Sequence, residues 1–348
     1  MKPERTGVAR YALNLVYALA EAAPDDEFVL CYRLSRFSRR KHRIPLPTAK
    51  FSQRWIQGGV RPRKVDVVHT TDARVHDWRG VPCISTVHDV FSLSSDEFAS
   101  GKFRKRRADQ YEAIAERATR IVAVSEYTRD EFWRHHPIDE DRFVVIPEGV
   151  EDRFRPEAAA GGQPVQREFG IHGAYVLFVG ELSVRKNVLN LLDAWAGMPD
   201  ESPTLVLAGR HRSDQLNVPE EVKMRGLAGR VVLTGYFPDR ALPALYAGAE
   251  CFVYPSLLEG FGLPVLEAMA CGTPVVTTDR GALPEVSGGH RIAVDPEDPE
   301  SIRGGILRVL TDPGLAESLR DRGLRWASLF RWPEVAKKTA AVYREVAG

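Results

Sequence analysis

The sequence predicts an α/β protein with two doubly wound parallel sheets, each in a domain of its own. Short apolar runs alternate with longer helical patterns along the whole chain, and this alternation is typical of βαβ crossovers. Runs such as YVLFVG, TLVLAG and CFVYPS are almost continuously apolar, as expected for parallel strands covered by helices on both faces. A length of 348 residues is long for one domain and comfortable for two.

The expected strands divide into two sets with a linker between them. They comprise residues 27–33, 65–70, 82–87, 120–125 and 142–147 in the first half, and 174–180, 203–209, 230–235, 250–255, 274–279 and 290–295 in the second. Expected helices between them include residues 187–196, 239–249 and 301–310. Residues 151–166 contain Pro, Ala and Gly without periodicity, which predicts a linker between two sheets.

One expected strand is absent from the first half. The run TGVARYALNLVYALAEA predicts a Gly-containing loop and a long helix, and only the polar run MKPER precedes it. In a doubly wound fold a central strand should lead into this helix. Its four or five apolar side chains, at roughly 1.5–3 kcal/mol each, would equal the usual net stability of a domain, roughly 5–15 kcal/mol. We therefore expect that the natural protein begins upstream of Met1 or has been shortened; the alternative is a variant whose sheet closes without this strand.

The composition is that of an ordinary globular protein, with 44% hydrophobic and 27% charged residues. The four cysteines are scattered without CxxC spacing, and Cys31, Cys83 and Cys251 lie in or beside apolar runs. We therefore expect buried free thiols in a reducing cytoplasm and no metal site. The sequence shows neither a signal peptide nor an apolar run of transmembrane length.

The net charge of +1 conceals a basic first half and an acidic second half. Basic residues cluster in runs 33–43 (RLSRFSRRKHR), 61–64 (RPRK) and 102–107 (KFRKRR). Such runs are usually solvated faces. They would also suit an anionic partner, either a membrane surface at which the protein binds peripherally or a phosphorylated acceptor. We do not expect nucleic acid, because no recognition motif accompanies the charge.

The strongest chemical signal is the run EGFGLPVLE, residues 259–267, directly after an expected strand. Gly260 and Gly262 allow a tight turn, and Pro264 suits the first position of a helix. A glycine loop that leads into a helix at the carboxyl end of a strand forms an anion site. Glu267 is placed to accept hydrogen bonds from vicinal hydroxyls, and Glu259 to reach a second polyol. The alternative is a structural turn with two solvated glutamates.

Two further runs end at the same edge of the expected sheet. Gly180 opens GELSVRKN, in which Arg185 and Lys186 begin the next helix. Two cations there suit a diphosphate and would stabilise its charge as it leaves. Gly209 and Arg210 end the run TLVLAGR, where glycine permits a close approach of the backbone. All three runs lie where ligands bind in open α/β sheets.

These runs, with TGYFPDRALPALYAGAECFVYPSLLEGFGLPVLEAMACGTPVV, resemble the retaining GT-B glycosyltransferases of family GT4 (group 1). The first-half runs TGVARYALNL, DVVHTTD, STVHDV, IVAVSEYTRDEF and VIPEGVEDRFRP resemble that family's N-terminal domain. The resemblance covers nearly the whole chain and is nearest to bacterial polysaccharide and O-antigen mannosyltransferases. It implies two Rossmann-like domains, residues 1–155 and 156–330, that face each other across a cleft. Residues 331–348, beginning near Trp332, would form a helix that returns to the N-terminal domain.

The resemblance assigns roles to residues of the second half. Arg185 and Lys186 would contact the donor diphosphate. Glu267 would bind ribose hydroxyls, and Glu259 would bind the transferred hexose and belong to the catalytic set. The remaining donor-binding residues would support the sugar and phosphate or lie near the nucleotide and its base: Gly180, Gly209, Arg210, Tyr236, Gly260, Phe261, Gly262 and Leu263.

In the first half the resemblance assigns three residues. His88, at the end of an expected strand in STVHDV, and Asp89 beside it would be catalytic, and His88 would face the donor sugar. Gly7 would approach the diphosphate. From the sequence alone, a histidine in this place is more often a packed residue. His69 in DVVHTTD also ends a strand, and its role stays open.

The implied reaction is transfer of a hexosyl group from a nucleotide sugar to a saccharide or lipid-linked glycan, with retention of configuration. A front-side displacement would let the leaving phosphate take the acceptor proton. No DxD motif follows a strand of the second half, so no metal and no other cofactor is expected. GDP-mannose is the first donor hypothesis and a UDP-hexose the second. A phosphorylase, a sugar-nucleotide epimerase and a non-catalytic nucleotide-sugar-binding protein remain alternatives; an NAD-dependent oxidoreductase is disfavoured because no GxGxxG follows a strand.

Overall fold

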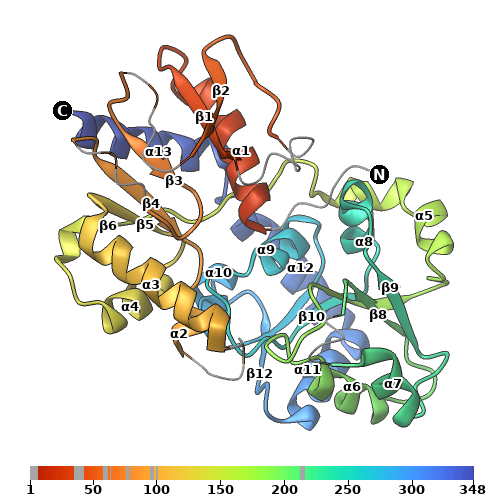
Figure 1. The fold of residues 1–348 in the computed structure, drawn as a ribbon. Coiled ribbons are helices and arrows are strands. Elements are labelled where there is room, and N and C mark those ends of the chain that lie inside the picture. The colour runs from red at the N-terminus through yellow and green to blue at the C-terminus, as the bar shows by residue number, and fades with distance from the viewer. Residues whose placement is uncertain are drawn as a thin grey trace. The chain divides into compact units, whose positions relative to one another are not determined.

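In the computed structural model the chain divides into two compact units. The structure describes residues 7–34, 43–57, 62, 64–75, 78, 80–94, 98, 101–211 and 216–348. Unit 1 comprises residues 1–149 and 330–348, and unit 2 comprises residues 150–329. The division falls at Gly149 and Val150, before the boundary at residue 155 that the sequence indicated. Figure 1 shows the elements of both units.

Unit 2 contains one six-stranded sheet whose strands are all parallel, with the order β12-β11-β10-β7-β8-β9. The strands are β7 (Tyr175–Val179), β8 (Thr204–Ala208), β9 (Val231–Gly235), β10 (Cys251–Tyr254), β11 (Val275–Thr278) and β12 (Ile292–Val294). The chain runs outward from β7 through β8 and β9, and then outward from β10 through β11 and β12 on the other side. The strand order therefore reverses between β7 and β10, the switch point at which doubly wound sheets bind ligands.

Helices cover both faces of this sheet, with α6, α7 and α11 on one face and α8, α9 and α12 on the other (Figure 1). Their bounds are α5 (Gln163–Glu168), α6 (Val188–Ala196), α7 (Val218–Met224), α8 (Leu242–Ala247), α9 (Leu263–Ala270), α10 (Leu283–Ser287), α11 (Pro299–Thr311) and α12 (Pro313–Ala327), with 3₁₀ turns η3 (Pro156–Gly161) and η4 (Asp239–Ala241). Strands β7, β10 and β11 are buried at almost every position. The continuous apolar runs thus form doubly covered parallel strands, as predicted.

Unit 1 is built around parallel strands in two separate sheets. One pairs β1 (Phe28–Arg33) with β2 (Phe51–Ile56), and the other has the order β3-β4-β5-β6. The latter strands are β3 (Val68–Thr70), β4 (Cys83–Val87), β5 (Arg120–Ala123) and β6 (Phe143–Val145). In the part of the chain that the structure describes, no ladder joins the two sheets. Residues 1–5, where the sequence lacks the expected strand, lie outside the described residues.

The helices of unit 1 include one from the C-terminal end of the chain. They are α1 (Gly7–Ala22), α2 (Phe91–Ser94), α3 (Gly101–Arg117), α4 (Glu126–His135) and α13 (Trp332–Ala347), with a 3₁₀ turn η2 (Glu140–Arg142). Tyr11 and Leu15 of α1 share a buried cluster with Trp332 and Ala336 of α13 and with Ile84 of β4. The C-terminal helix is therefore part of the core of unit 1.

Two sequence-based expectations on local structure are wrong. Strand β2 was not expected, because the run FSQRWI holds three polar residues in a row between apolar ends. Residues 151–166 were expected to be an irregular linker, but η3 and the start of α5 occupy most of them. Pro156 stands in the first turn of η3 and alanines follow it, a combination that favours helical structure over a loop.

Three further expectations concern the cysteines, membrane-spanning helices and the basic runs. Cys83, Cys251 and Cys271 are buried free thiols, and Cys31 is partly buried. Among the described residues, no helix is long and apolar enough to cross a membrane. The basic run 102–107 lies on α3. Most of the run 33–43 and half of the run 61–64 lie outside the described residues.

Candidate functional site

The site in unit 2 forms where the loops after β7 and β10 meet. Because these strands are neighbours, their carboxyl ends lie side by side, and the loops that follow them share one edge of the sheet. Arg185 and Lys186 were expected to begin the next helix, but they lie in the first loop, because α6 begins only at Val188. Glu259 belongs to the second loop. A hydrogen bond from the backbone N–H of Leu257 to the carbonyl of Arg185 (2.9 Å) ties the two loops together.

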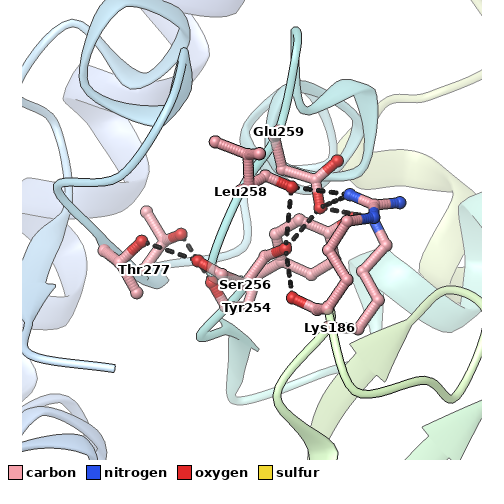
Figure 2. A network of polar contacts seen from close by, with 8 residues as sticks. Lys186, Tyr254, Ser256, Leu258, Glu259 and Thr277 are labelled. Carbon is pink, nitrogen blue, oxygen red and sulfur yellow. Dashed lines mark hydrogen bonds and ion pairs between the residues drawn. The ribbon is translucent and has the colours of Figure 1, made fainter. Parts of the chain in front are cut away.

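Glu259 is the centre of a buried polar cluster (Figure 2). Its Oε1 accepts hydrogen bonds from the Nζ of Lys186 and from the hydroxyl of Ser256. The same atom lies 3.0 Å from a guanidinium nitrogen of Arg185. Lys186 also donates to the hydroxyl of Tyr254, whose backbone carbonyl accepts from Thr277 (2.6 Å).

The charges of this cluster are mutually stabilised. Burial opposes ionisation of Glu259, but the cations Arg185 and Lys186 and the hydrogen bonds from Lys186 and Ser256 outweigh it, and they lower the pKa of Glu259 to about 2. Glu259 is only 8% exposed. The side chain of Lys186 is 10% exposed and that of Arg185 is 20% exposed. The cluster is thus a preformed set of two cations and one carboxylate, from which Arg185 is the most accessible to an incoming anion.

Glu267 lies in α9, and its carboxylate is almost fully buried, at 1% exposure. The hydroxyl of Tyr246, in α8, donates to its Oε2 at 3.0 Å. Tyr246 itself is fully buried and packs edge-on against Phe154 and Phe252. The hydrogen bond from Tyr246 therefore fixes the direction of this carboxylate.

Two glycines of the site are required by their surroundings. Gly262 has φ +100° and stands immediately before α9, so that a side chain there would be strained and would contact Leu283 at 2.7 Å. A Cβ on Gly209 would lie 1.7 Å from the carbonyl oxygen of Gly180, so the backbones after β7 and β8 touch. Pro264 takes the second position of α9 and not the first, because the helix begins at Leu263.

The other expected donor-binding residues of unit 2 occupy the same edge. Gly260 and Phe261 are buried in the turn between Glu259 and α9. The guanidinium of Arg210 lies over the ring of Tyr236, 5.6 Å from its centroid, and the tyrosine is 38% exposed. The structure thus brings all of these residues to the loops that follow β7, β8, β9 and β10.

In unit 1, His88 follows β4 and both of its ring nitrogens have partners. Nδ1 lies 2.9 Å from Oε1 of Glu148, and Nε2 lies 3.0 Å from the carbonyl oxygen of Thr71. The edge of Tyr11 packs against its ring, with centroids 4.6 Å apart. Burial opposes the charge on His88, but Glu148, the Thr71 carbonyl and the Asp89 carboxylate outweigh it, and the pKa of His88 is raised.

The other two expected residues of the first half are Asp89 and Gly7. The backbone carbonyl of Asp89 accepts a 2.7 Å hydrogen bond from Tyr111. Gly7 is exposed at the start of α1, with open space where a side chain would be.

The sequence did not indicate that Tyr246, Tyr254, Ser256 and Glu148 would be partners of the expected site residues. Ser256 lies three residues before Glu259 in the same loop, and this proximity was a usable signal. Tyr246 and Glu148 reach their partners only through the fold, across 21 and 60 residues of chain.

Unit 2 also has a cavity of about 410 Å³ between η3 and the start of α8. Arg153, Arg155, Glu157 and Arg240 contribute its charged lining. It shares no lining residue with the site described above. Arg153 there is already paired with Glu151 and Asp239.

Comparison with known families gives two matches that together span most of the chain. Residues 166–326 match the family model described as glycosyl transferases group 1. Residues 5–154 match the model described as glycosyltransferase family 4.

Two relatives from Escherichia coli show how far the likeness extends. O-antigen chain mannosyltransferase B is 31% identical over 368 aligned residues, which cover 97% of this chain and 96% of that protein. Serotype-specific mannosyltransferase WbdA is 31% identical over 268 residues, which cover 74% of this chain and 32% of that protein. This chain therefore spans about a third of that longer relative.

Solved structures give the same fold. Sucrose-phosphate synthase from Thermosynechococcus elongatus superposes with a TM-score of 0.76 at 23% identity, over 98% of this chain and 94% of that one. Anabaena HepE in complex with UDP-glucose gives a TM-score of 0.77 at 17% identity, over 98% and 97%. These likenesses confirm the predicted fold class, GT-B with two Rossmann-like parallel-sheet domains.

Proposed function

Because this chain belongs to the group 1 glycosyltransferases of family GT4, we propose that it transfers mannose from GDP-mannose to a saccharide or lipid-linked glycan. That it is a glycosyltransferase follows from the family; the donor, the acceptor and the residue roles are the proposal. The observation that carries it is the cluster of Arg185, Lys186 and Glu259 at the switch point of unit 2, with Glu267 fixed in the helix that follows. The mannosyltransferase names of the relatives support the choice of sugar.

In the proposed reaction the bond between the anomeric carbon and the diphosphate oxygen breaks. The acceptor oxygen forms the new bond on the same face of the sugar, and its proton passes to the leaving phosphate. The chain's contribution is positioning and electrostatic stabilisation. Arg185 and Lys186 would stabilise the diphosphate as it gains charge, each charge-assisted hydrogen bond contributing roughly 1.5–3 kcal/mol.

The two carboxylates would have separate roles. Glu267, whose Oε2 accepts from Tyr246, would bind the ribose hydroxyls. Glu259 would bind the hexose hydroxyls; its low pKa keeps it an acceptor of hydrogen bonds over the whole physiological range. The proposal includes no metal ion, because Arg185 and Lys186 would supply the positive charge next to the diphosphate.

A UDP-hexose is the second candidate donor, favoured by the match to Anabaena HepE in complex with UDP-glucose. The test is transfer to a panel of saccharide acceptors with GDP-mannose, UDP-glucose and UDP-galactose, each without metal. The proposal predicts α-linked product from GDP-mannose with retained configuration, read by NMR of the new anomeric centre. Product from a UDP-hexose alone would select the second candidate, and inverted product would refute the mechanism.

A second proposal concerns the surface at which the protein would reach its acceptor. Lys102, Lys105 and Arg106 are exposed near the start of α3 and would suit a cytoplasmic enzyme that touches an anionic membrane. Vesicles with and without phosphatidylglycerol test this. Binding that needs the anionic lipid and falls with salt would support it; equal sedimentation with neutral vesicles would refute it.

A further inference from the structure

The two ring nitrogens of His88 face atoms that accept hydrogen bonds. Nε2 lies 3.0 Å from the backbone carbonyl oxygen of Thr71, which has no proton to give. Nδ1 lies 2.9 Å from a carboxylate oxygen of Glu148. A neutral imidazole has one N–H and one bare nitrogen, so it can satisfy only one such partner. Both contacts are hydrogen bonds at the same time when both nitrogens carry protons.

A second histidine in the same unit provides the contrast. His69 has its Nδ1 2.7 Å from the hydroxyl of Tyr343 and its Nε2 2.7 Å from the hydroxyl of Thr86. A hydroxyl can either donate or accept, so this site suits the neutral ring. Burial, and then the charge of His88, lower the pKa of His69 to about 3. His69 is therefore a neutral hydrogen-bonding residue, and only the surroundings of His88 demand a charge.

The charged and titratable groups around His88 favour the same state. Glu148, after β6, is 6% exposed, and Asp89 follows His88 in the chain. The ring of Tyr11, from α1, packs against His88, and the neutral His69, from β3, lies close enough for the charge of His88 to lower its pKa. The ordinary pKa of histidine, about 6.5, is thereby raised.

We propose that Glu148 is a positioning residue that holds His88 as an imidazolium, so that His88 contributes a fixed positive charge and does not accept a proton during transfer. The proposal rests on the function proposed above for its catalytic part. It agrees with a displacement in which the leaving phosphate takes the acceptor proton, because such a reaction needs no protein base. A carbonyl and a carboxylate also fix the plane of the ring.

The direct test is the protonation state of the His88 ring in the full-length protein. Long-range ¹H–¹⁵N spectra of histidine-labelled protein distinguish a bare ring nitrogen from a protonated one, and loss of the signal in His88→Gln assigns it. We expect two protonated nitrogens at pH 7.5. A bare nitrogen on His88 at that pH would overturn the proposal, including the case in which the proton resides on Glu148.

Variants of Glu148 test whether this carboxylate keeps the ring of His88 protonated. In Glu148→Gln the amide N–H₂ can donate to Nδ1 while Nε2–H still donates to Thr71, so His88 should become neutral at pH 7.5. Glu148→Asp keeps the carboxylate and should keep the ring protonated, which provides a second variant if the first does not fold. The control is Glu131→Gln: Glu131 is another buried glutamate of unit 1, paired with Arg134 and His135. It should leave His88 unchanged.

The catalytic part is tested by pH–rate profiles. The wild type should keep its kcat/KM between pH 6 and pH 8, because His88 stays charged. Glu148→Gln should lose at least tenfold in kcat at pH 8 and recover as the pH falls and the ring takes up its proton, with little change in nucleotide affinity. A pH-independent Glu148→Gln rate would refute a catalytic role for the charge. No transfer by the wild type with any sugar nucleotide would instead refute the proposed function, and the NMR result would still decide the protonation state.

Discussion

Replacement of Lys186 by Met should expose how strongly the cluster in unit 2 depends on its charges. Lys186 and Glu259 are both nearly buried, and the pKa of Glu259 is lowered from 4.5 to about 2. A shift of that size corresponds to about 3 kcal/mol of stabilisation of the carboxylate by its surroundings. Removal of one partner of a buried ion pair costs roughly 3–5 kcal/mol in other proteins. Because Arg185 and Ser256 remain as partners of Glu259, we expect Lys186→Met to lower the free energy of unfolding by about 3 kcal/mol.

A double-mutant cycle isolates the pair. Glu259→Gln should lower the free energy of unfolding by a similar amount, because it leaves the cation of Lys186 buried beside the hydroxyl of Tyr254. The double variant should cost about as much as either single variant, which gives a coupling energy of about 3 kcal/mol. Hydrogen exchange read by mass spectrometry on peptides from β7 and β10 reports the stability of unit 2 alone. Additive single effects would refute the ion-pair account.

The low pKa of Glu259 also predicts how the stability of unit 2 depends on pH. The folded-state pKa of Glu259 is below its unfolded value, so its stabilisation is present above pH 4.5 and is lost as the pH falls towards 2. Glu259→Gln should therefore show a weaker acid destabilisation of unit 2 than the wild type. An unchanged acid profile in this variant would show that other carboxylates control it.

Two further variants test the scaffold of the site. Tyr246→Phe removes the hydroxyl that holds Glu267 and should weaken nucleotide binding several-fold in calorimetric titrations. Tyr175→Phe, which removes a buried hydroxyl bonded to the carbonyl of Leu245, should leave the affinity unchanged; equal losses in both variants would contradict the role of Tyr246. Gly209→Ala should cost about 3 kcal/mol or more in thermal unfolding, because the backbone must move away from the new Cβ. Gly304→Ala, in α11 with open space around it, should instead be neutral or stabilising by up to about 1 kcal/mol, and a similar loss in both would refute the steric argument.

The strands could be predicted because burial on both faces leaves a direct signal in the sequence. Every strand of unit 2 lies within an expected range, with its ends displaced by a residue or two. Strand β2 gave no such signal, because Ser52, Gln53 and Arg54 stand between its apolar ends. Its six residues nevertheless pair with β1. Local sequence therefore identifies strands with continuous apolar runs well and misses a strand that polar residues interrupt.

The candidate site was predictable as far as its loops were continuous in sequence. EGFGLPVLE and GELSVRKN each carry their polar residues together, and the parallel sheet brings them to one edge. The direction of each side chain was not predictable, since it depends on distant partners. Nothing in the run STVHDV indicates that His88 meets Glu148, 60 residues later. The fixed positive charge that we propose for His88 depends on this contact, so the local sequence could not indicate it.

The central claim is that unit 2 binds a nucleoside diphosphate at the edge formed by β7 and β10. Calorimetric titration of the full chain with GDP, UDP and ADP, without metal, tests it most directly, with Glu267→Gln as the matched variant. We predict clear binding of one nucleotide, with GDP first, and at least a tenfold loss of affinity in Glu267→Gln. If no nucleotide binds the folded protein, or if Glu267→Gln binds as tightly as the wild type, the account of this site is wrong.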